Sequence, residues 1–271
     1  MPQPPLDLSR VFRLEPHGPD TWLGESPAYA WGRIYGGLVL AQALWAATQT
    51  VRSEHVVHSL HAYFILGGEL GEPVRYEVDR VRNGRSFSTR RVVARQSAGA
   101  ILTLGCSFQK REDGPEAPAV PFPSDVPPPG GLASQWDAGL ERRDVVVPAR
   151  PPRSAVWVRF PEPLGEDPRL SACALAYLSD TSPMDAVAAS RPGGRPSEGE
   201  WDQNVMGVSL DHAMWFHRDC RADDWVLIDL AGHGLFRTRG LATGAVFRRD
   251  GAQVATVAQE CLLRERRAGQ A

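Results

Sequence analysis

Apolar residues along this chain form runs of two kinds, one with helical spacing and one with the length and alternation of strands. Residues 38–47 carry no charge and place apolar side chains at helical spacing, which predicts a helix buried on most of its surface. Two short strands are expected before this helix, at 11–14 and 22–24. Four longer strands are predicted after it, separated by glycine-containing turns: 56–66, 74–82, 86–95 and 100–109.

The second half of the chain repeats this plan of one helix followed by four strands. After a strand at 155–160, an alanine- and leucine-rich helix is predicted at 171–179, and a further helical turn begins at Pro183. Four strands are then predicted, the last two joined by a hairpin turn at Asp250-Gly251: 204–217, 225–230, 235–248 and 253–264.

Short similarities between the halves support an internal duplication. Residues 59–64 (SLHAYF) resemble 209–216 (SLDHAMWF), which is two residues longer, and 100–104 (AILTL) resembles 253–257 (QVATV). A central apolar helix that precedes an antiparallel sheet is best buried when the sheet wraps around it. Two such units joined sheet edge to sheet edge predict an α+β fold of the double hotdog type.

A proline-rich segment separates the two halves. Seven prolines fall between Glu112 and Gly131. Because proline lacks the N–H that helices and strand ladders require, we expect an extended connector on the surface. The predicted organisation is a first hotdog repeat at 1–111, a connector at 112–150 and a second repeat at 151–271.

Composition narrows the class of protein without identifying it. The 271 residues are 42% hydrophobic and 23% charged, which is typical of a globular protein rather than a disordered one. A formal net charge of -2 gives no global electrostatic argument for binding nucleic acid. No apolar run reaches the roughly 18 residues of a membrane-spanning helix. The N-terminus also lacks the layout of a secretion signal, so we expect a cytoplasmic protein.

The four cysteines are far apart in the sequence and have no metal-ligand spacing. We therefore expect buried free thiols and no bound metal. The cysteines are Cys106, Cys173, Cys220 and Cys261.

Several segments, in their order along the chain, resemble segments of the bacterial acyl-CoA thioesterase II family. They are 35–43 (YGGLVLAQA), 57–64 (VHSLHAYF), 82–92 (RNGRSFSTRRV) and 211–218 (DHAMWFHR), with shorter matches at 239–240 and 258–260. The resemblance spans nearly the whole chain outside the connector, and the joint order of the segments is far more specific than any one of them.

The resemblance implies a double hotdog hydrolase that cleaves fatty acyl-CoA thioesters. The family's catalytic aspartate, threonine or serine, and glutamine correspond here to Asp180, Ser209 and Gln259. No cofactor is implied, because coenzyme A is part of the substrate. We also expect a homo-oligomer, a dimer or tetramer of double hotdogs.

This sequence departs from the family pattern in three places. A serine stands at position 209 where some members carry threonine, and Cys261 replaces a glycine. The segment between Asp180 and Ser209 is longer and contains the insert 191–196 (RPGGRP). The insert puts the acyl chain preference in doubt more than the chemistry.

The three residue types suit hydrolysis by water. A carboxylate can take a proton from water, whereas a hydroxyl and an amide can both donate and accept hydrogen bonds and so orient it. Burial would have to raise the pKa of Asp180 from about 3.9 for it to act as a base near neutral pH. An aspartate at the C-terminal end of an apolar helix is electrostatically unfavourable, and such a violation often marks function. The alternative is that Asp180 or Ser182 merely caps the helical turn that begins at Pro183.

The other two positions are less distinctive on their own. Ser209 does not lie in the Gly-x-Ser-x-Gly motif of serine hydrolases, and a serine in a strand is commonly just a polar position. Gln259 lies in a largely apolar strand, where a buried amide must find partners or lose about 1–3 kcal/mol. The equivalent position in the first repeat is Cys106, and the helix at 38–47 has no acid. We therefore expect one working site per chain.

Two further groups of residues have more than one interpretation. Arg82, Arg85, Arg90 and Arg91 could bind the phosphates of coenzyme A, although a solvated strand face explains them more simply. His212 and His217 lie near Asp211, but their spacing matches no familiar metal site, which favours hydrogen bonding in the core or at an interface.

Two alternatives to hydrolysis remain at this level. A hydratase or dehydratase acting on acyl thioesters would need a histidine beside the acid, and residues 171–190 contain none. A non-catalytic acyl-CoA-binding protein would not need all three polar groups, and their presence argues against it.

Overall fold

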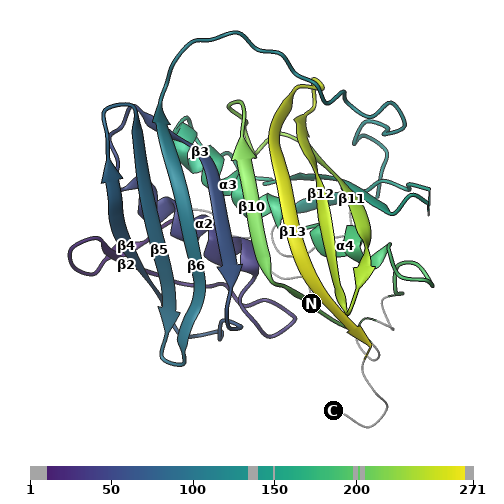
Figure 1. The fold of residues 1–271 in the computed structure, drawn as a ribbon, viewed down its shortest axis with the longest axis horizontal. Coiled ribbons are helices and arrows are strands. Elements are labelled where there is room, and N and C mark those ends of the chain that lie inside the picture. Colours follow the sequence, from purple (N-terminus) through teal and green to yellow (C-terminus); the bar gives the residue numbers. More distant parts are fainter. Residues whose placement is uncertain (1–10, 134–139, 149, 198–200, 202–204, 266–271) are drawn as a thin grey trace.

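The two halves of the chain form one antiparallel sheet with two packed helices on one of its faces (Figure 1). The computed structural model describes residues 11–133, 140–148, 150–197, 201 and 205–265. Within these residues the first half contains β1 (Glu15–Pro16), β2 (Thr21–Gly24), α2 (Gly36–Thr48), β3 (His55–Phe64), β4 (Val74–Asn83), β5 (Phe87–Gln96) and β6 (Gly99–Lys110). The second half contains β7 (Glu141–Asp144), β8 (Arg153–Arg159), α3 (Pro168–Ser179), α4 (Pro183–Ala188), β9 (Val205–Ser209), β10 (Asp211–Phe216), β11 (Val226–Phe236), β12 (Arg239–Arg248) and β13 (Gln253–Glu265).

Both halves have the same strand order when it is followed outward from the centre of the sheet. Strands β3 and β10 pair there, with Leu60 opposite Met214 and Ala62 opposite His212. From β3 the order is β6, β5, β4, β2 and β1, and from β10 it is β13, β12, β11, β8 and β7. This symmetry is the double hotdog arrangement that the sequence predicts.

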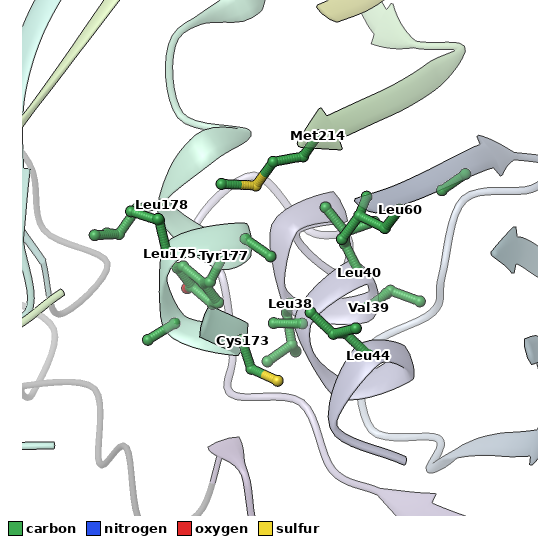
Figure 2. Close-up of a cluster of buried hydrophobic side chains, with 14 of the residues drawn as sticks. Leu38, Val39, Leu40, Leu44, Leu60, Cys173, Leu175, Tyr177, Leu178 and Met214 are labelled. Atoms are coloured by element: carbon green, nitrogen blue, oxygen red, sulfur yellow. The ribbon is translucent and has the colours of Figure 1, made fainter. Parts of the chain in front are cut away.

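The two central helices lie against each other in the core (Figure 2). Helix α2 is buried along nearly its whole length, as its lack of charge predicts. In α3, Pro168 occupies the first turn and the Asp167 side chain accepts a hydrogen bond from the Arg169 N–H, so the helix begins with a proper cap. Apolar side chains of both helices meet those of the central strands: Leu38, Leu40, Leu44, Leu60, Cys173, Leu175, Tyr177 and Met214.

One long predicted strand is divided in two. The sequence predicts a single strand at 204–217, but the structure has β9 and β10, with the break at Leu210. Strand β9 pairs only with the end of β13, whereas β10 pairs with both β13 and β3. Apolar and polar residues alternate across the break at 208–211, as in a single strand, so the pattern along the chain does not reveal the change of partners.

The predicted connector at 112–150 is not uniformly a surface segment. Strand β7 lies inside it and pairs with β8 at the outer edge of the sheet. Phe122 and the buried Val126 pack in a second small apolar cluster with Trp157 and Phe247. No helix occurs in the described residues of this segment, but the proline pattern does not show that apolar side chains between the prolines are buried.

Smaller differences from the prediction concern the ends of strands. No strand forms at the predicted position 11–14: the first strand is β1 at Glu15–Pro16, and Val11 and Phe12 before it are buried in the core. Strand β11 extends to Phe236, and the turn to β12 occurs at Arg237 and Thr238, both with positive φ.

In the described part of the chain, no helix has both the length and the hydropathy needed to cross a membrane.

Candidate active site

The structure brings the side chains of Asp180, Ser209 and Gln259 together, although the three lie far apart in the second half of the chain. Asp180 follows the last residue of α3, Ser209 ends β9, and Gln259 lies in β13. Ser209 pairs with Cys261 of β13, and Gln259 is on the same face of that strand because it is two residues away. The Gln259 Nε2 donates a hydrogen bond of 2.7 Å to the Ser209 Oγ.

Three hydrogen-bond donors surround the Asp180 carboxylate. They are the Gln259 side chain, the backbone N–H of Gly37 and the Ser209 hydroxyl, and each of them lowers the pKa of the carboxyl. The Asp180 Oδ1 atom is buried and has no hydrogen-bond partner of its own within the described residues. That oxygen is therefore a buried acceptor left without a donor beside Ser209 and Gln259.

The N-terminus of the first repeat's helix completes this environment. A Cβ atom at Gly36 would lie 2.8 Å from the Asp180 Oδ2, and one at Gly37 would lie 2.5 Å from the Tyr177 carbonyl oxygen. Only glycine lets the start of α2 approach the end of α3 this closely. Asp180 thus lies at the unfavourable C-terminal end of α3 but faces the favourable N-terminal end of α2.

Burial determines the titration of Asp180. Loss of solvent raises the pKa of its carboxyl to about 7, despite the three donors that act in the opposite direction. The neighbouring Tyr35 and Tyr177 are buried, and burial raises the pKa of each well above its usual value, so both remain neutral. Asp180 therefore exchanges its proton near neutral pH, as a general base requires.

Gln259 is also bonded on its other side. Its Oε1 is hydrogen-bonded to the Nδ1 of His212, and the Nε2 of His212 lies 2.8 Å from the Ser179 Oγ. Gln259 and His212 are both buried. The structure thus gives His212 the hydrogen-bonding role that its sequence context favours. No cluster of three or more His, Cys, Asp or Glu side chains that could hold a metal occurs within the described residues.

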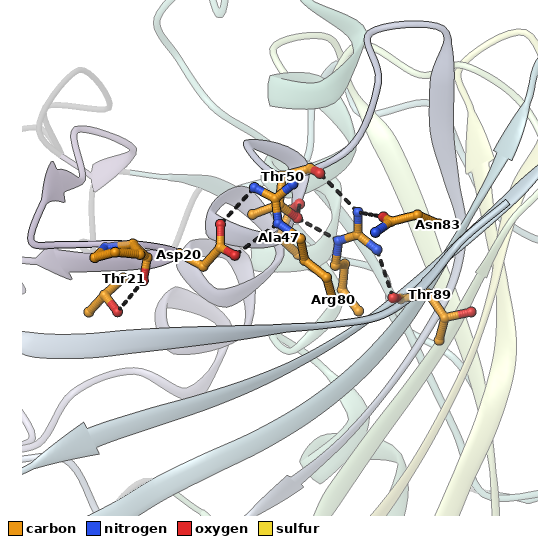
Figure 3. Close-up of polar contacts among 9 residues, drawn as sticks. Asp20, Thr21, Ala47, Thr50, Arg80, Asn83 and Thr89 are labelled. Carbon is orange, nitrogen blue, oxygen red and sulfur yellow. Dashed lines mark hydrogen bonds and ion pairs between the residues drawn. The ribbon is translucent and has the colours of Figure 1, made fainter. Parts of the chain in front are cut away.

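The corresponding place in the first repeat has different chemistry. Cys106 lies opposite Leu60 of β3 and opposite Arg90 of β5, so it occupies the first half's counterpart of the Gln259 position. The Arg90 side chain is 1% exposed and donates to the Thr50 Oγ1 at 2.6 Å and the Asn83 Oδ1 at 2.6 Å (Figure 3). The first repeat therefore holds a structural arginine here, whose guanidinium is satisfied by protein partners.

Of the four arginines predicted to bind coenzyme A, Arg90 lies away from Asp180. Arg90 contacts Thr50, just beyond the end of α2, whereas Asp180 lies at its start, about 20 Å away for a helix of this length. The Arg90 guanidinium is also occupied by protein partners, which does not favour a phosphate contact. Arg82 and Arg85 are exposed, and Arg91 is exposed and pairs with Asp79 at 3.2 Å. For these three, phosphate binding stays a prediction.

Comparison with known proteins assigns the family. Models described as the acyl-CoA thioesterase N-terminal and C-terminal domains match residues 25–109 and 111–263. Mouse acyl-coenzyme A thioesterase 8 is 33% identical, covering 95% of this chain and 88% of the mouse protein. The acyl-CoA thioesterase II structure from Mycobacterium marinum is 33% identical with a TM-score of 0.83, covering 98% of this chain and all of that one. The chain belongs to the acyl-CoA thioesterase II family.

Family membership agrees with the fold. A hot dog fold protein from Alicyclobacillus acidocaldarius is similar in fold alone, with 21% identity and a TM-score of 0.76 over 95% of this chain and 97% of that one. For this thioesterase family member, sequence reasoning did not find two contributors to the site, the Gly37 N–H and His212. The Gly36-Gly37 pair before an apolar helix was the available signal for the first, whereas nothing along the chain links His212 to Gln259.

Proposed function

We propose that this protein hydrolyses fatty acyl-CoA thioesters to the free acid and coenzyme A, using one water molecule held by Asp180, Ser209 and Gln259. The observation that carries the proposal is the convergence of these three side chains around a buried carboxyl whose pKa is raised to about 7 by burial. Its membership of the acyl-CoA thioesterase II family supports the substrate class.

Each group has a defined part in the reaction. The water oxygen attacks the thioester carbonyl carbon while the Asp180 carboxylate takes a proton from the water. Gln259 and Ser209 orient the water through their hydrogen bonds. A backbone N–H stabilises the oxyanion that forms on the carbonyl oxygen. The intermediate then collapses, the carbon–sulfur bond breaks, and the proton from Asp180 passes to the departing thiolate.

Three further expectations belong to this proposal. The reaction needs no cofactor, since coenzyme A enters as part of the substrate, and the protein acts in the cytoplasm. The chain assembles with copies of itself as a dimer or tetramer of double hotdogs. Large apolar side chains exposed on the sheet, among them Tyr63 and Trp215, support self-association. Light scattering after size exclusion measures the assembly, and a monomer at micromolar concentration would contradict it.

The function is tested by thiol release from a panel of acyl-CoA substrates. Asp180→Asn keeps the shape of the side chain but cannot accept a proton, so kcat is expected to fall by about 10²–10⁴-fold. Wild-type kcat/KM should rise with pH through about 7, because the ionised Asp180 is the active form. Asp20→Asn, on an exposed ion pair with Arg80, is the matched control and should behave as wild type.

Two outcomes would refute the proposal. If Asp180→Asn retains wild-type turnover, the assigned site is wrong. If neither protein releases thiol while acyl-CoA still binds, the protein is a binding protein. The hydratase alternative gains no support from His212, because Gln259 stands between that ring and Asp180 and both ring nitrogens already have partners.

A further inference from the structure

A continuous chain of hydrogen bonds passes from the α3 backbone to the Asp180 carboxylate. It begins at Ser179, whose Oγ lies 2.8 Å from the His212 Nε2. It continues from the His212 Nδ1 to the Gln259 Oε1, and from the Gln259 Nε2 to the Ser209 Oγ at 2.7 Å. Gln259 and Ser209 are both donors beside Asp180, and each lowers the pKa of its carboxyl. Ser179 and His212, the buried beginning of this series, lie outside the three groups assigned to the reaction.

The number of available hydrogen atoms limits the directions in which these hydrogen bonds can run. A neutral imidazole carries one N–H, and burial lowers the pKa of His212 to about 4, so the ring is neutral at working pH. An amide oxygen facing the Nδ1 of His212 requires the hydrogen to be on that nitrogen. The bare Nε2 must then accept the single hydrogen of the Ser179 hydroxyl, which also has the Ala176 carbonyl oxygen at 2.8 Å as a competing acceptor.

The opposite tautomer of His212 would reverse the direction of every hydrogen bond in this series. With the hydrogen on Nε2, the ring would donate to Ser179, and the amide of Gln259 would have to turn over to donate to the bare Nδ1. The Ser209 hydroxyl would then donate to the amide oxygen. In that arrangement neither the amide N–H groups nor the Ser209 hydroxyl would point at Asp180.

Only the first arrangement suits the carboxylate. An ionised carboxylate accepts hydrogen bonds and donates none, so Asp180 is satisfied when Gln259 and Ser209 both direct hydrogens toward it. The tautomer of His212 and the orientation of the Gln259 amide are therefore linked. The ring decides which end of the amide faces the reacting water.

We propose that His212 is a positioning residue of this thioesterase: it donates from Nδ1 to Gln259, accepts at Nε2 from Ser179, and so fixes the amide with its N–H groups toward Ser209 and Asp180. The inference rests on the proposed function of Asp180, Ser209 and Gln259. His212 does not touch substrate or water, and it acts through Gln259 alone.

Substitution of the ring separates this role from a purely structural one. His212→Leu removes both hydrogen bonds and is expected to lower kcat by about 10²-fold, with KM for acyl-CoA nearly unchanged, because the water is misplaced rather than the substrate. The acid limb of the kcat/KM profile should move to higher pH, since Asp180 loses correctly directed donors. His212→Asn can still donate from a position close to that of Nδ1 and should recover part of the loss.

Two comparisons make the result specific. Met214→Ala, a buried change two residues away on β10, should lower stability without moving the acid limb. In a Gln259→Ala background, His212→Leu should cause no further loss of kcat, because its effect passes through the amide. Additive losses in the double variant, or wild-type kcat and pH profile in His212→Leu, would overturn the proposal. If Asp180→Asn remains active, the proposed function itself fails, independently of His212.

A measurement on the wild-type protein does not depend on whether the variants fold. Nitrogen-15 NMR of the histidine side chains distinguishes the two tautomers, and His212 can be assigned through its contact with the Gln259 side-chain amide. We expect the hydrogen on Nδ1 at pH 7 to 8. A hydrogen on Nε2 would overturn the assigned orientation.

Discussion

At the residue scale, the reactivity of Asp180 results from opposing electrostatic influences. Burial against the aromatic side chains of Tyr35 and Tyr177 favours the neutral acid, whereas donors from Gly37, Gln259 and Ser209 favour the carboxylate. Burial has the larger effect, so the pKa of Asp180 is raised to about 7. The donors keep the carboxylate accessible at physiological pH and also direct their hydrogens toward it.

Asp180 should make folding stability depend on pH. Its pKa in the folded protein, about 7, lies above its ordinary value of 3.8, so the folded state binds the extra proton between these pH values. The free energy of unfolding therefore falls as pH rises through this window. Asp180→Asn removes the effect, and its stability relative to wild type should rise by up to about 1.4 kcal/mol per pH unit.

Urea unfolding at pH 5 and pH 8 measures this difference. Asp20→Asn is the matched control with the opposite sign, because the hydrogen bond from Arg80 lowers the pKa of Asp20. Its contribution to stability is present at high pH and is lost as pH falls through the lowered pKa. A gap between Asp180→Asn and wild type that does not change with pH would show that Asp180 titrates in its ordinary range.

At the element scale, the site depends on two antiparallel helices contributed by different repeats. The start of α2 meets the end of α3 at Gly37 and Tyr177, while Arg169 near the start of α3 lies over the ring of Trp45 near the end of α2. The N-terminal dipole of one repeat's helix therefore acts on the carboxylate of the other. Neither repeat alone contains both.

A methyl group at Gly37 should disturb this contact. Gly37→Ala places a Cβ 2.5 Å from the Tyr177 carbonyl oxygen, so the helices must separate, which is expected to cost about 1–3 kcal/mol of stability. Activity should fall further than stability alone explains, because the Gly37 N–H moves away from Asp180. Gly105→Ala is the control, since no atom lies within 4 Å of its added Cβ. Thermal unfolding and thiol release measure both effects, and equal behaviour of the two variants would contradict the close helix contact.

The turn after Asp180 is held by a partly buried arginine from β7. Arg142 donates to the Thr181 carbonyl oxygen at 2.9 Å and pairs with Asp185 at 2.6 Å and Asp144 at 2.7 Å. Arg142→Met should cost about 3 kcal/mol, because carboxylates shielded from solvent lose their cation. In this variant Asp185 still pairs with Arg195 at 2.6 Å, so the loss of stability should be at the lower end of the range for breaking a buried ion pair.

The corresponding control is Arg80→Met, which breaks an exposed pair with Asp20 and should cost less than about 1 kcal/mol. Denaturant unfolding measures both variants. If Arg142→Met is no more destabilising than Arg80→Met, the cluster does not hold the turn.

At the scale of the whole molecule, a symmetric sheet contains an asymmetric site. The strand order is the same on both sides of β3 and β10, yet the carboxyl and the amide lie only in the second repeat. The first repeat supplies the start of α2 and one edge of the central strand pair. In the first repeat, Arg90 lies opposite Cys106, the counterpart of Gln259, and has a structural role.

The two halves should therefore need each other to fold and to act. Separate chains of residues 1–130 and 131–271 each leave a central strand edge unpaired and one face of a buried helix uncovered. Expressed alone, each is expected to aggregate and to release no thiol from acyl-CoA. Expressed together they should assemble and recover activity, aided by the packing of Phe122 and Val126 on Trp157. Solubility and thiol release decide the matter, and a stable monomeric first half would contradict this view.

The sequence by itself determined most of the elements and the duplication, and its resemblance to a known family supplied the three candidate side chains. Charge-free helical spacing at 38–47 and short strands separated by turns are local properties, and local properties are visible along the chain. The tertiary structure alone decided how the candidate site is arranged. The division of the predicted strand at 204–217, the approach of Gly37 to Asp180 and the hydrogen bond between His212 and Gln259 join residues that are distant in sequence. The raised pKa of Asp180 likewise depends on how completely other segments exclude water from it, and no local pattern records that.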